Sequence, residues 1–489
     1  MILTAALLTI SCFQAIASEK PDNSKETNGD TSASSWQRIE ANYRLPTWYE
    51  DAKFGIFIHW GPYSVPGWAP GKAYSEWYPH NIYRANSKRS SKWRQYHQQT
   101  YGSDFGYKDF IPQFKAEHWD PQDWAKLFKQ AGARYVIPVG EHHDGFAMWD
   151  SALTRWDAKD MGPKRDIIGE LAKAVRSSGM KYAVSYHRER HFSYFNQDDE
   201  RLKRELAANP DAAELYGPFE LSKEFIRDYQ ARWQEICDKY QPDFMWLDDI
   251  PAFYQQPDHP NIVAYQQTLL EMVSDYLKQS QHWQKSVYFN NKGKHRNFDT
   301  DAGVLSKDNM TIDGIGPKWE NPATFGHSFA YNYIEDDNGS YKDSDELVDL
   351  LIDVVSKNGN LLLNIGPKAD GTITAPQRVG LLAVGRWLQI NGEGIYGSRP
   401  WQAYGEDNIR YTRKGNNTLF AFDLEARNGS ILLPLTAQFK QSDIASIELL
   451  GFDQVQWQIT SAGLEVSNPQ QKSVEATVYK INFHQNIIN

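Results

Sequence analysis

The stretch DPQDWAKLFKQAGARYVIPVG, residues 120–140, decides the expected fold because it encodes a helix, a turn and a strand in that order. Asp120 is a preferred helix N-cap, and Pro121 suits the first helical position because no N–H bond is needed there. Gly132 is a typical helix stop, and the apolar run YVIPV that follows is typical of a buried strand.

The same order of helix and strand recurs along the chain. The further units span residues 166–187, 224–249, 263–291 and 343–367, and strand-like runs stand at KFGIFIHWG (53–61) and HSFAYNY (327–333). Seven or eight strands with intervening helices favour a closed parallel α/β barrel of the (β/α)8 type over an open sheet. No GxGxxG motif follows a strand, which argues against a dinucleotide-binding fold.

From Trp401 onward, short alternating strands separated by Gly and Asn turns replace the helical units. A segment of this kind predicts a small antiparallel β-sandwich. We therefore expect a barrel catalytic domain over residues 39–398 and a C-terminal sandwich over residues 399–489.

The N-terminus MILTAALLTISCFQAIASEK indicates export. Its apolar segment and the Ala15-Ile16-Ala17 site predict a signal peptide over residues 1–17, followed by a polar linker over residues 18–38. Lipid anchoring through Cys12 is the alternative to cleavage, and either route leads to a periplasmic or secreted protein. No later segment is apolar enough to span a membrane.

Composition narrows the class of ligand. The net charge of −10 is spread along the chain without a basic block, which gives nucleic-acid binding no electrostatic support. Aromatic residues make up 14% of the chain, and their flat rings with polar edges suit the faces of sugars. The sequence does not indicate an oligomeric state or a cofactor.

Polar residues follow five of the expected strands at the point where each strand ends. They are His59, His142-His143-Asp144, Tyr186-His187, Asp248-Asp249 and Asn290-Asn291. In an α/β barrel these ends share one face, which carries the active site, so we expect these side chains to line one pocket.

The stretch EHHDGFAMWD, residues 141–150, raises the question of a metal site. Neighbouring strand residues point to opposite faces, so His142 and His143 chelate one ion only if the strand has already turned. Without a cysteine companion or an HExxH motif, binding of sugar hydroxyls is the preferred interpretation, and no metal is expected.

In FMWLDDI the alternation of a strand places Trp246 and Asp248 on one face and Leu247 and Asp249 on the other. One of the two aspartates is therefore expected to enter the pocket above the tryptophan. A helix cap or an ion pair would be the ordinary role of a strand-end acid, but no capping pattern follows Asp249 directly. Catalysis is the better interpretation.

Several long segments resemble glycoside hydrolase family 29, the α-L-fucosidases, in the order that the family has them. They are WYEDAKFGIFIHWGPYSVP, YSEWYP, EHHDGFAMWDS, YQPDFMWLDD, KWE, NLLLNIGPKADGTI and WLQINGEGIYGSRPW, within residues 46–401. The resemblance implies retaining exo-hydrolysis of terminal α-L-fucosides through a covalent glycosyl-aspartate.

The resemblance also implies roles for particular residues. Asp248 matches the nucleophile of the W-x-D motif, and Lys292 stands where many members have an arginine. The residues that would bind fucose are His59, Glu76, Trp77, His142, His143, Tyr186 and Trp246.

A retaining mechanism needs a second carboxyl about 5–5.5 Å from the nucleophile, acting as acid and then as base. The segment RNFDTDAGV resembles the place where relatives carry this group, and it offers Asp301. Glu320 in KWE is the alternative, with Asp299 and Asp308 behind it.

The segment HRERHF, after the third pocket strand, departs from the family by carrying Arg188 and Arg190. A solvated loop is the ordinary interpretation. The alternative is an anion subsite, with KHR at 294–296 facing it, that would accept sulfated fucan oligosaccharides, because guanidinium groups suit sulfate or carboxylate.

Two rival functions stay open at this stage. One is an endo-acting or relaxed-specificity glycosidase on fucose-containing polysaccharide, in which the long loops at 84–110 and 188–220 would shape several subsites. The other is a fucose-binding protein that has lost the acid/base residue.

Overall fold

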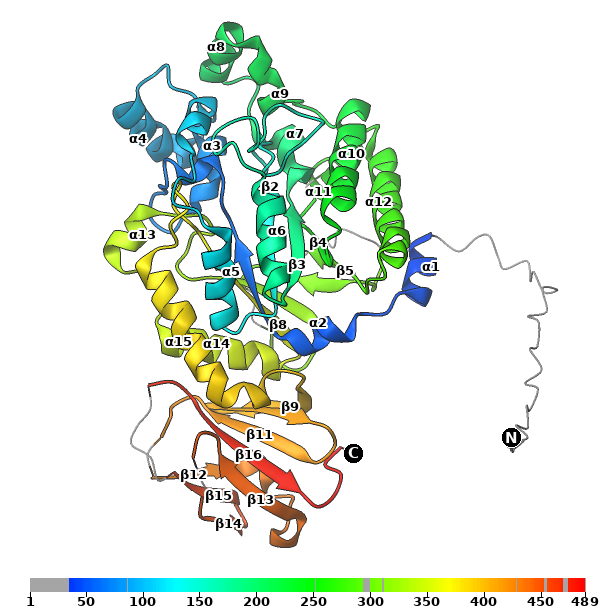
Figure 1. Cartoon of the computed structure of the whole chain (residues 1–489), viewed down its shortest axis with the longest axis vertical. Helices are drawn as coiled ribbons and strands as arrows, with labels where there is room; N and C mark the ends of the chain where they lie inside the picture. The colour runs from blue at the N-terminus through cyan, green and yellow to red at the C-terminus, as the bar shows by residue number, and fades with distance from the viewer. Residues whose placement is uncertain are drawn as a thin grey trace, which may run out of the picture.

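The computed structural model describes residues 35–85, 87–250, 252–292, 300–309, 312–427, 429–452, 455–468 and 474–488. Its first part is a closed barrel of eight parallel strands in sequence order, which confirms the expected fold (Figure 1). The strands are β1 (Phe54–Ile58), β2 (Tyr135–Glu141), β3 (Lys181–Tyr186), β4 (Phe244–Leu247), β5 (Tyr288–Lys292), β6 (Val304–Ser306), β7 (Trp319–Thr324) and β8 (Gly359–Ile365).

Helices surround this barrel. They are α5 (Pro121–Gln130), α6 (Ile167–Ser177), α10 (Lys223–Tyr240), α12 (Ile262–His282), α14 (Ser344–Ser356) and α15 (Ala375–Asn391), preceded by α1 (Ser35–Asn42) and α2 (Thr47–Ala52). The helix α5 forms as its sequence predicts: the Asp120 carboxylate accepts from the Gln122 N–H, and Trp124, Leu127 and Phe128 are buried. None of the helices in the described ranges is long and apolar enough to cross a membrane.

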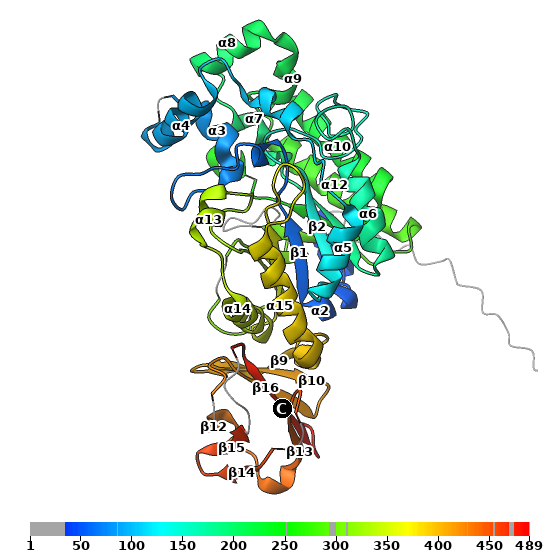
Figure 2. The same ribbon diagram turned by 60° about the vertical axis from the view of Figure 1, so that its left-hand side comes forward.

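Short helices gather at the carboxyl ends of the barrel strands. They are α3 (Tyr78–Ile82), α4 (Ser91–Tyr101), α7 (His191–Tyr194), α8 (Glu200–Ala208), α9 (Ala213–Tyr216), α11 (Ala252–Gln255) and α13 (Tyr333–Asn338). The helices α3, α4, α7, α8 and α9 lie at the end of the barrel opposite the C-terminal domain (Figures 1 and 2). The long loops after β1 and β3 therefore build the walls above the strand ends.

The expected strand HSFAYNY is wrong. The strand that precedes β8 is β7 at Trp319–Thr324, and residues 327–332 form an irregular loop. The reason is that side chains take the backbone donors that a strand would need: Glu335 accepts from the N–H groups of His327 and Ser328. Glu76 accepts from the N–H of Ala330.

A buried carboxyl group stands inside the barrel. Glu320 of β7 accepts hydrogen bonds from the hydroxyls of Tyr49 at 2.9 Å and Tyr135 at 2.8 Å. Gly55 of β1 makes room for this arrangement, because a Cβ there would lie 2.4 Å from the Tyr135 ring. The barrel interior is thus a packed layer with a polar centre below the pocket.

The C-terminal domain is an antiparallel β-sandwich, as expected. Its larger sheet has the order β13-β16-β11-β10-β9 and its smaller sheet the order β12-β15-β14. The strands are β9 (Arg399–Glu406), β10 (Ile409–Lys414), β11 (Thr418–Asp423), β12 (Gly429–Leu433), β13 (Ile444–Leu449), β14 (Trp457–Thr460), β15 (Gly463–Asn468) and β16 (Thr477–Phe483). The Trp387 indole N–H donates to the Ala476 carbonyl at 2.8 Å, which ties α15 to this domain.

Candidate active site

A cavity of about 340 Å³ opens at the carboxyl ends of the barrel strands. Residues from six successive strand ends line it together with loop residues: His59, His142, His143, His187, Trp246, Asp248, Asp249, Lys292, Lys307 and Asp308, with Phe57, Tyr74, Glu76, Trp77, Arg190 and Phe329. Groups that are remote in sequence therefore meet in one pocket.

Asp248, directly after β4, is a carboxylate with three charged or ionisable neighbours in this pocket. One oxygen contacts the ammonium of Lys292, and the other lies 3.2 Å from Nε2 of His143 and 3.8 Å from Nδ1 of His187. Burial favours the neutral acid, but Lys292 and His143 outweigh it and hold the pKa of Asp248 well below its usual value. Asp248 is therefore an ionised, desolvated carboxylate, as a nucleophile must be.

Asp308, in the turn after β6, lies on the other side of the same lysine. Its Oδ2 is 2.9 Å from Nζ of Lys292. Burial raises the pKa of Asp308, and the neighbouring Asp248 charge adds to the rise, although Lys292 opposes both. Two carboxyl groups in one pocket thus have pKa values moved in opposite directions, which is the usual arrangement of an acid and a nucleophile.

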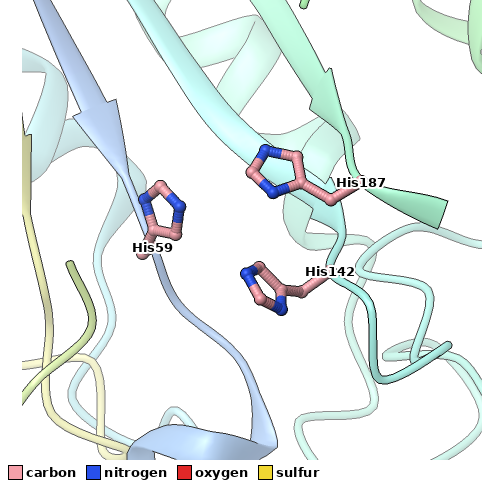
Figure 3. A group of neighbouring side chains, drawn as sticks. All are labelled: His59, His142 and His187. Atoms are coloured by element: carbon pink, nitrogen blue, oxygen red, sulfur yellow. The ribbon is translucent and has the colours of Figure 1, made fainter. Parts of the chain in front are cut away.

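Three histidines converge from the ends of β1, β2 and β3: His59, His142 and His187 (Figure 3). Their ring centroids lie 5.1–5.9 Å apart. Burial lowers the pKa of each ring, that of His59 to about 3, so the rings are neutral at neutral pH. Nδ1 of His59 lies 2.6 Å from the Asn364 amide oxygen, which fixes the proton on Nδ1 and turns the Nε2 lone pair outward.

These rings could hold a metal ion or sugar hydroxyls. Within each of two groups, His59–His142–His187 and His143–His187–Asp248, the ligand atoms lie within 4.8 Å of one another. Neutral imidazole is the form that binds zinc, and it also accepts or donates one hydrogen bond to a hydroxyl.

Glu76 forms another wall of the pocket. Its Oε2 accepts from the Ala330 N–H at 3.1 Å and from the Ser328 hydroxyl at 3.3 Å. Burial raises the pKa of Glu76 to about 7. The carboxyl is therefore held rigidly by the loop that replaces the expected strand at 327–333.

The sequence model of the family described as Alpha-L-fucosidase matches residues 20–393. Tissue alpha-L-fucosidase of Rattus norvegicus is 32% identical over 452 residues, which cover 89% of this chain and 88% of that protein. The chain belongs to the alpha-L-fucosidase family.

Further relatives agree with this membership. Tissue alpha-L-fucosidase of Homo sapiens is 31% identical over 451 residues, covering 89% of this chain and 87% of that protein. The structure of Thermotoga maritima alpha-fucosidase in complex with fucose has a TM-score of 0.74 at 31% identity and covers 91% of this chain and 99% of that one. The chain is thus a glycoside hydrolase whose activity is that of an α-L-fucosidase.

The structure places most of the fucose-binding residues that the family resemblance implies around one cavity. His59, Glu76, Trp77, His142, His143, Trp246 and Lys292 all line the pocket with Asp248. Both His142 and His143 reach it because β2 ends at Glu141 and the chain turns there. Gly145, at a φ of +81°, continues that turn.

Tyr186 is the exception and lies outside the fucosidase pocket. Its hydroxyl donates to the Tyr229 carbonyl of α10 at 3.0 Å, so the side chain faces the helix layer. His187 takes the expected place and lies against Trp246, with ring centroids 5.3 Å apart. Ser185 and His187 share a face and lie 2.5 Å apart, from Oγ to Nε2, but the alternation alone does not show whether this face or that of Tyr186 points into the barrel.

Asp301, the expected acid/base residue of this fucosidase, does not reach the pocket either. It is exposed and lines a separate cavity of about 440 Å³ between the segments 300–305 and 312–319. The register of the short strand β6, which the sequence does not reveal, brings Asp308 to the pocket in its place. Asp299 lies outside the described residues.

Glu320, the alternative acid, is a structural residue below the pocket. It is 0% exposed, and its Oε1 accepts from the Trp246 indole N–H at 3.0 Å. Burial raises its pKa to about 7. Glu320 therefore anchors the tryptophan that forms the pocket floor and does not itself line the pocket.

The two arginines of HRERHF have different surroundings. Arg188 is buried, with guanidinium nitrogens 2.5 Å from Glu141 and 2.5 Å from Asp228. Because these two carboxylates already pair with it, the expectation that Arg188 belongs to an anion subsite is wrong. Arg190 lines the pocket, 3.0 Å from Asp249 and with its guanidinium carbon 5.9 Å from the centre of the Trp77 ring. Residues 294–296 lie outside the described part of the chain.

Proposed function

We propose that the chain is a retaining, exo-acting α-L-fucosidase that removes terminal fucose from fucose-containing glycans through a glycosyl-aspartate at Asp248. The observation that carries this proposal is the position of Lys292 between an ionised Asp248 and a more basic Asp308.

The spacing of the two carboxyl groups supports retention. One carboxyl oxygen of Asp248 and one of Asp308 contact the same ammonium nitrogen of Lys292. These two oxygens therefore lie no further apart than about 6 Å, which is twice the length of a hydrogen bond. Retaining glycosidases place their carboxyl groups about 5–5.5 Å apart, whereas inverting enzymes leave about 6.5–9.5 Å for a water molecule.

In the first step, Asp248 attacks the anomeric carbon as the bond to the aglycone oxygen breaks. Protonated Asp308 gives its proton to that oxygen. In the second step, the Asp308 carboxylate takes a proton from water, which attacks the anomeric carbon and releases Asp248. Lys292 neutralises part of the charge on both carboxyl groups throughout the cycle.

The relatives support this assignment. Thermotoga maritima alpha-fucosidase, 31% identical to this chain, has been solved with a mechanism-based inhibitor and with fucose. The depth of the pocket favours exo-action, since Phe57 and Trp246 close its base with 1% and 0% exposure.

The experiment that tests the proposal uses an aryl α-L-fucoside and rescue by azide. Asp248→Ala should lose activity by about 10³-fold or more and yield the β-fucosyl azide by direct displacement. Asp308→Ala should keep the first step on this good leaving group and yield the α-fucosyl azide from the covalent intermediate.

The matched control is Asp249→Asn. Its loss should be at least about 100-fold smaller than that of Asp248→Asn, because Asp249 pairs with Arg190 at the rim. A larger loss at Asp249, or azide products of the opposite configurations, would overturn the assignment.

We also propose that the protein is exported, on the strength of its apolar N-terminal segment, which lies outside the described residues. Fractionation of cells and N-terminal sequencing of the mature protein test this, and Cys12→Ser separates the two routes. Loss of membrane association in that variant indicates lipid anchoring; an unchanged soluble product starting near Ser18 indicates cleavage.

A further inference from the structure

A second cavity of about 530 Å³ adjoins the fucose pocket. The two cavities share Trp77 and Arg190. The Trp77 ring lies between them, 5.4 Å from the His143 ring on the side of the sugar pocket and 5.1 Å from the His80 ring on the side of the second cavity. A glycan whose terminal fucose occupies the first cavity would therefore place its next sugar beside Trp77, at the second.

The lining of this cavity is cationic. Arg84 and Arg190 contribute their guanidinium groups, of which that of Arg190 pairs with Asp249 of the fucose pocket, and none of the described residues that line this second cavity is an Asp or Glu. Ser87, Ser193, Asn196 and Gln255 add hydroxyl and amide groups of the kind that bind sugar hydroxyls.

Arg84 is oriented by a neutral partner. Its guanidinium donates to Nε2 of His80 at 2.8 Å, and Nδ1 of His80 in turn lies 2.5 Å from the Tyr194 carbonyl. The carboxylate of the nearby Asp199 accepts hydrogen bonds from the backbone N–H groups of Ala85 and Arg201, at 3.0 Å each. Among the interactions of the described residues, Arg84 is thus held in place by a hydrogen bond to a neutral ring and takes part in no ion pair.

We propose that this second cavity is a subsite for an aglycone sugar that carries a sulfate or carboxylate group, and that Arg84 binds this group. The proposal rests on the fucosidase function above, and it assigns to Arg84 the role that the sequence suggested for Arg188. A guanidinium group can donate two parallel N–H hydrogen bonds to two oxygens of a sulfate or of a carboxylate. The same arginine therefore suits a sulfated sugar and a uronic acid.

The test compares three α-L-fucosides whose second sugar is galactose, galactose carrying a sulfate ester, or galacturonate. The wild-type protein should show a higher kcat/KM for at least one anionic substrate than for the neutral one. Arg84→Gln should lower this preference about tenfold, the effect of one charge-assisted hydrogen bond.

The control is Arg89→Gln, which removes the same charge from an exposed residue five positions further along the chain that does not line the cavity. It should leave the preference unchanged. The substrate that is preferred identifies the anion as sulfate or carboxylate, and added NaCl should weaken the preference.

The proposal is overturned if the wild-type protein shows no preference, or if Arg84→Gln and Arg89→Gln change it equally. Failure of the fucosidase function would show separately, as no turnover of a neutral aryl fucoside. In that case calorimetry with galactose 6-sulfate, galacturonate and galactose decides: anion binding that Arg84→Gln removes supports the subsite, and no anion binding overturns it.

Discussion

The ammonium group of Lys292 contacts the carboxylate of Asp248 and stacks over the Trp246 ring, 4.6 Å from its centre. The same nitrogen lies 2.9 Å from Asp308. One cation thus joins the two carboxyl groups to which we assign the chemistry.

Removing this cation should impair catalysis. Lys292→Met keeps the length of the side chain but leaves Asp248 without its strongest charge partner, so kcat/KM should fall about 10²-fold. Lys292→Arg, which keeps the positive charge at this position, should lose less than about tenfold. Steady-state kinetics on an aryl α-L-fucoside measure kcat/KM of both variants. Equal losses in Lys292→Met and Lys292→Arg would show that catalysis does not depend on the positive charge.

The pH dependence of kcat/KM should have a basic limb set by Asp308. The acid is active when protonated, and its pKa is raised by burial, so activity should fall as the pH rises through that pKa. Asp248, whose pKa is depressed, should stay ionised down to strongly acidic pH. In Asp308→Asn the basic limb should disappear; its persistence would assign it to another group, such as Glu76.

Glu320 should matter for stability. Glu320→Leu leaves the donors of Tyr49, Tyr135 and Trp246 buried without their acceptor, so the free energy of unfolding should fall by about 2–4 kcal/mol. Glu320→Gln keeps one acceptor and should cost less. Denaturant unfolding measures both, and a Leu variant as stable as the wild-type protein would contradict the structural role.

The same residue predicts a pH-dependent difference in stability. The pKa of Glu320 is raised to about 7 in the folded protein, against about 4.3 in an unfolded chain. The folded state therefore binds this proton more tightly, and the stability of wild type relative to Glu320→Gln should be greatest below pH about 4. It should fall by up to about 1.4 kcal/mol per pH unit as the pH rises toward 7.

The histidines predict the response to metals. If His59, His142 and His187 bind sugar hydroxyls, EDTA should not lower the activity, whereas added Zn²⁺ should inhibit in competition with fucose because the three ligand atoms can share one ion. His187→Asn should weaken that inhibition. Loss of activity in EDTA, restored by a metal, would contradict the assignment of these rings to the sugar.

Much of the site could be predicted because a parallel barrel brings its strand ends together. The alternation in FMWLDDI places Asp248 beside Trp246, and the end of β2 at Glu141 turns both His142 and His143 inward. These positions depend on local geometry, which the sequence encodes directly.

The rest depends on the register of strands and loops. The apolar run of β3 does not show by itself which of Tyr186 and His187 faces inward, and the three-residue strand β6 is too short to leave a clear pattern. Asp301 and Asp308 stand on either side of β6, and only the three-dimensional path of the chain separates them. Arg188 likewise has the sequence of a surface loop but lies buried between Glu141 and Asp228.

The most direct test of the central claim is to identify the residue that bonds to fucose. A 2-fluoro-fucosyl fluoride should trap the covalent intermediate, because fluorine slows its hydrolysis. Mass spectrometry of the digested protein should find the fluorofucosyl mass on the peptide that carries the W-L-D-D sequence, and fragmentation should place it on Asp248. A label on Asp249 or Asp308, or turnover that releases fucose with inverted configuration and no label, would contradict the account.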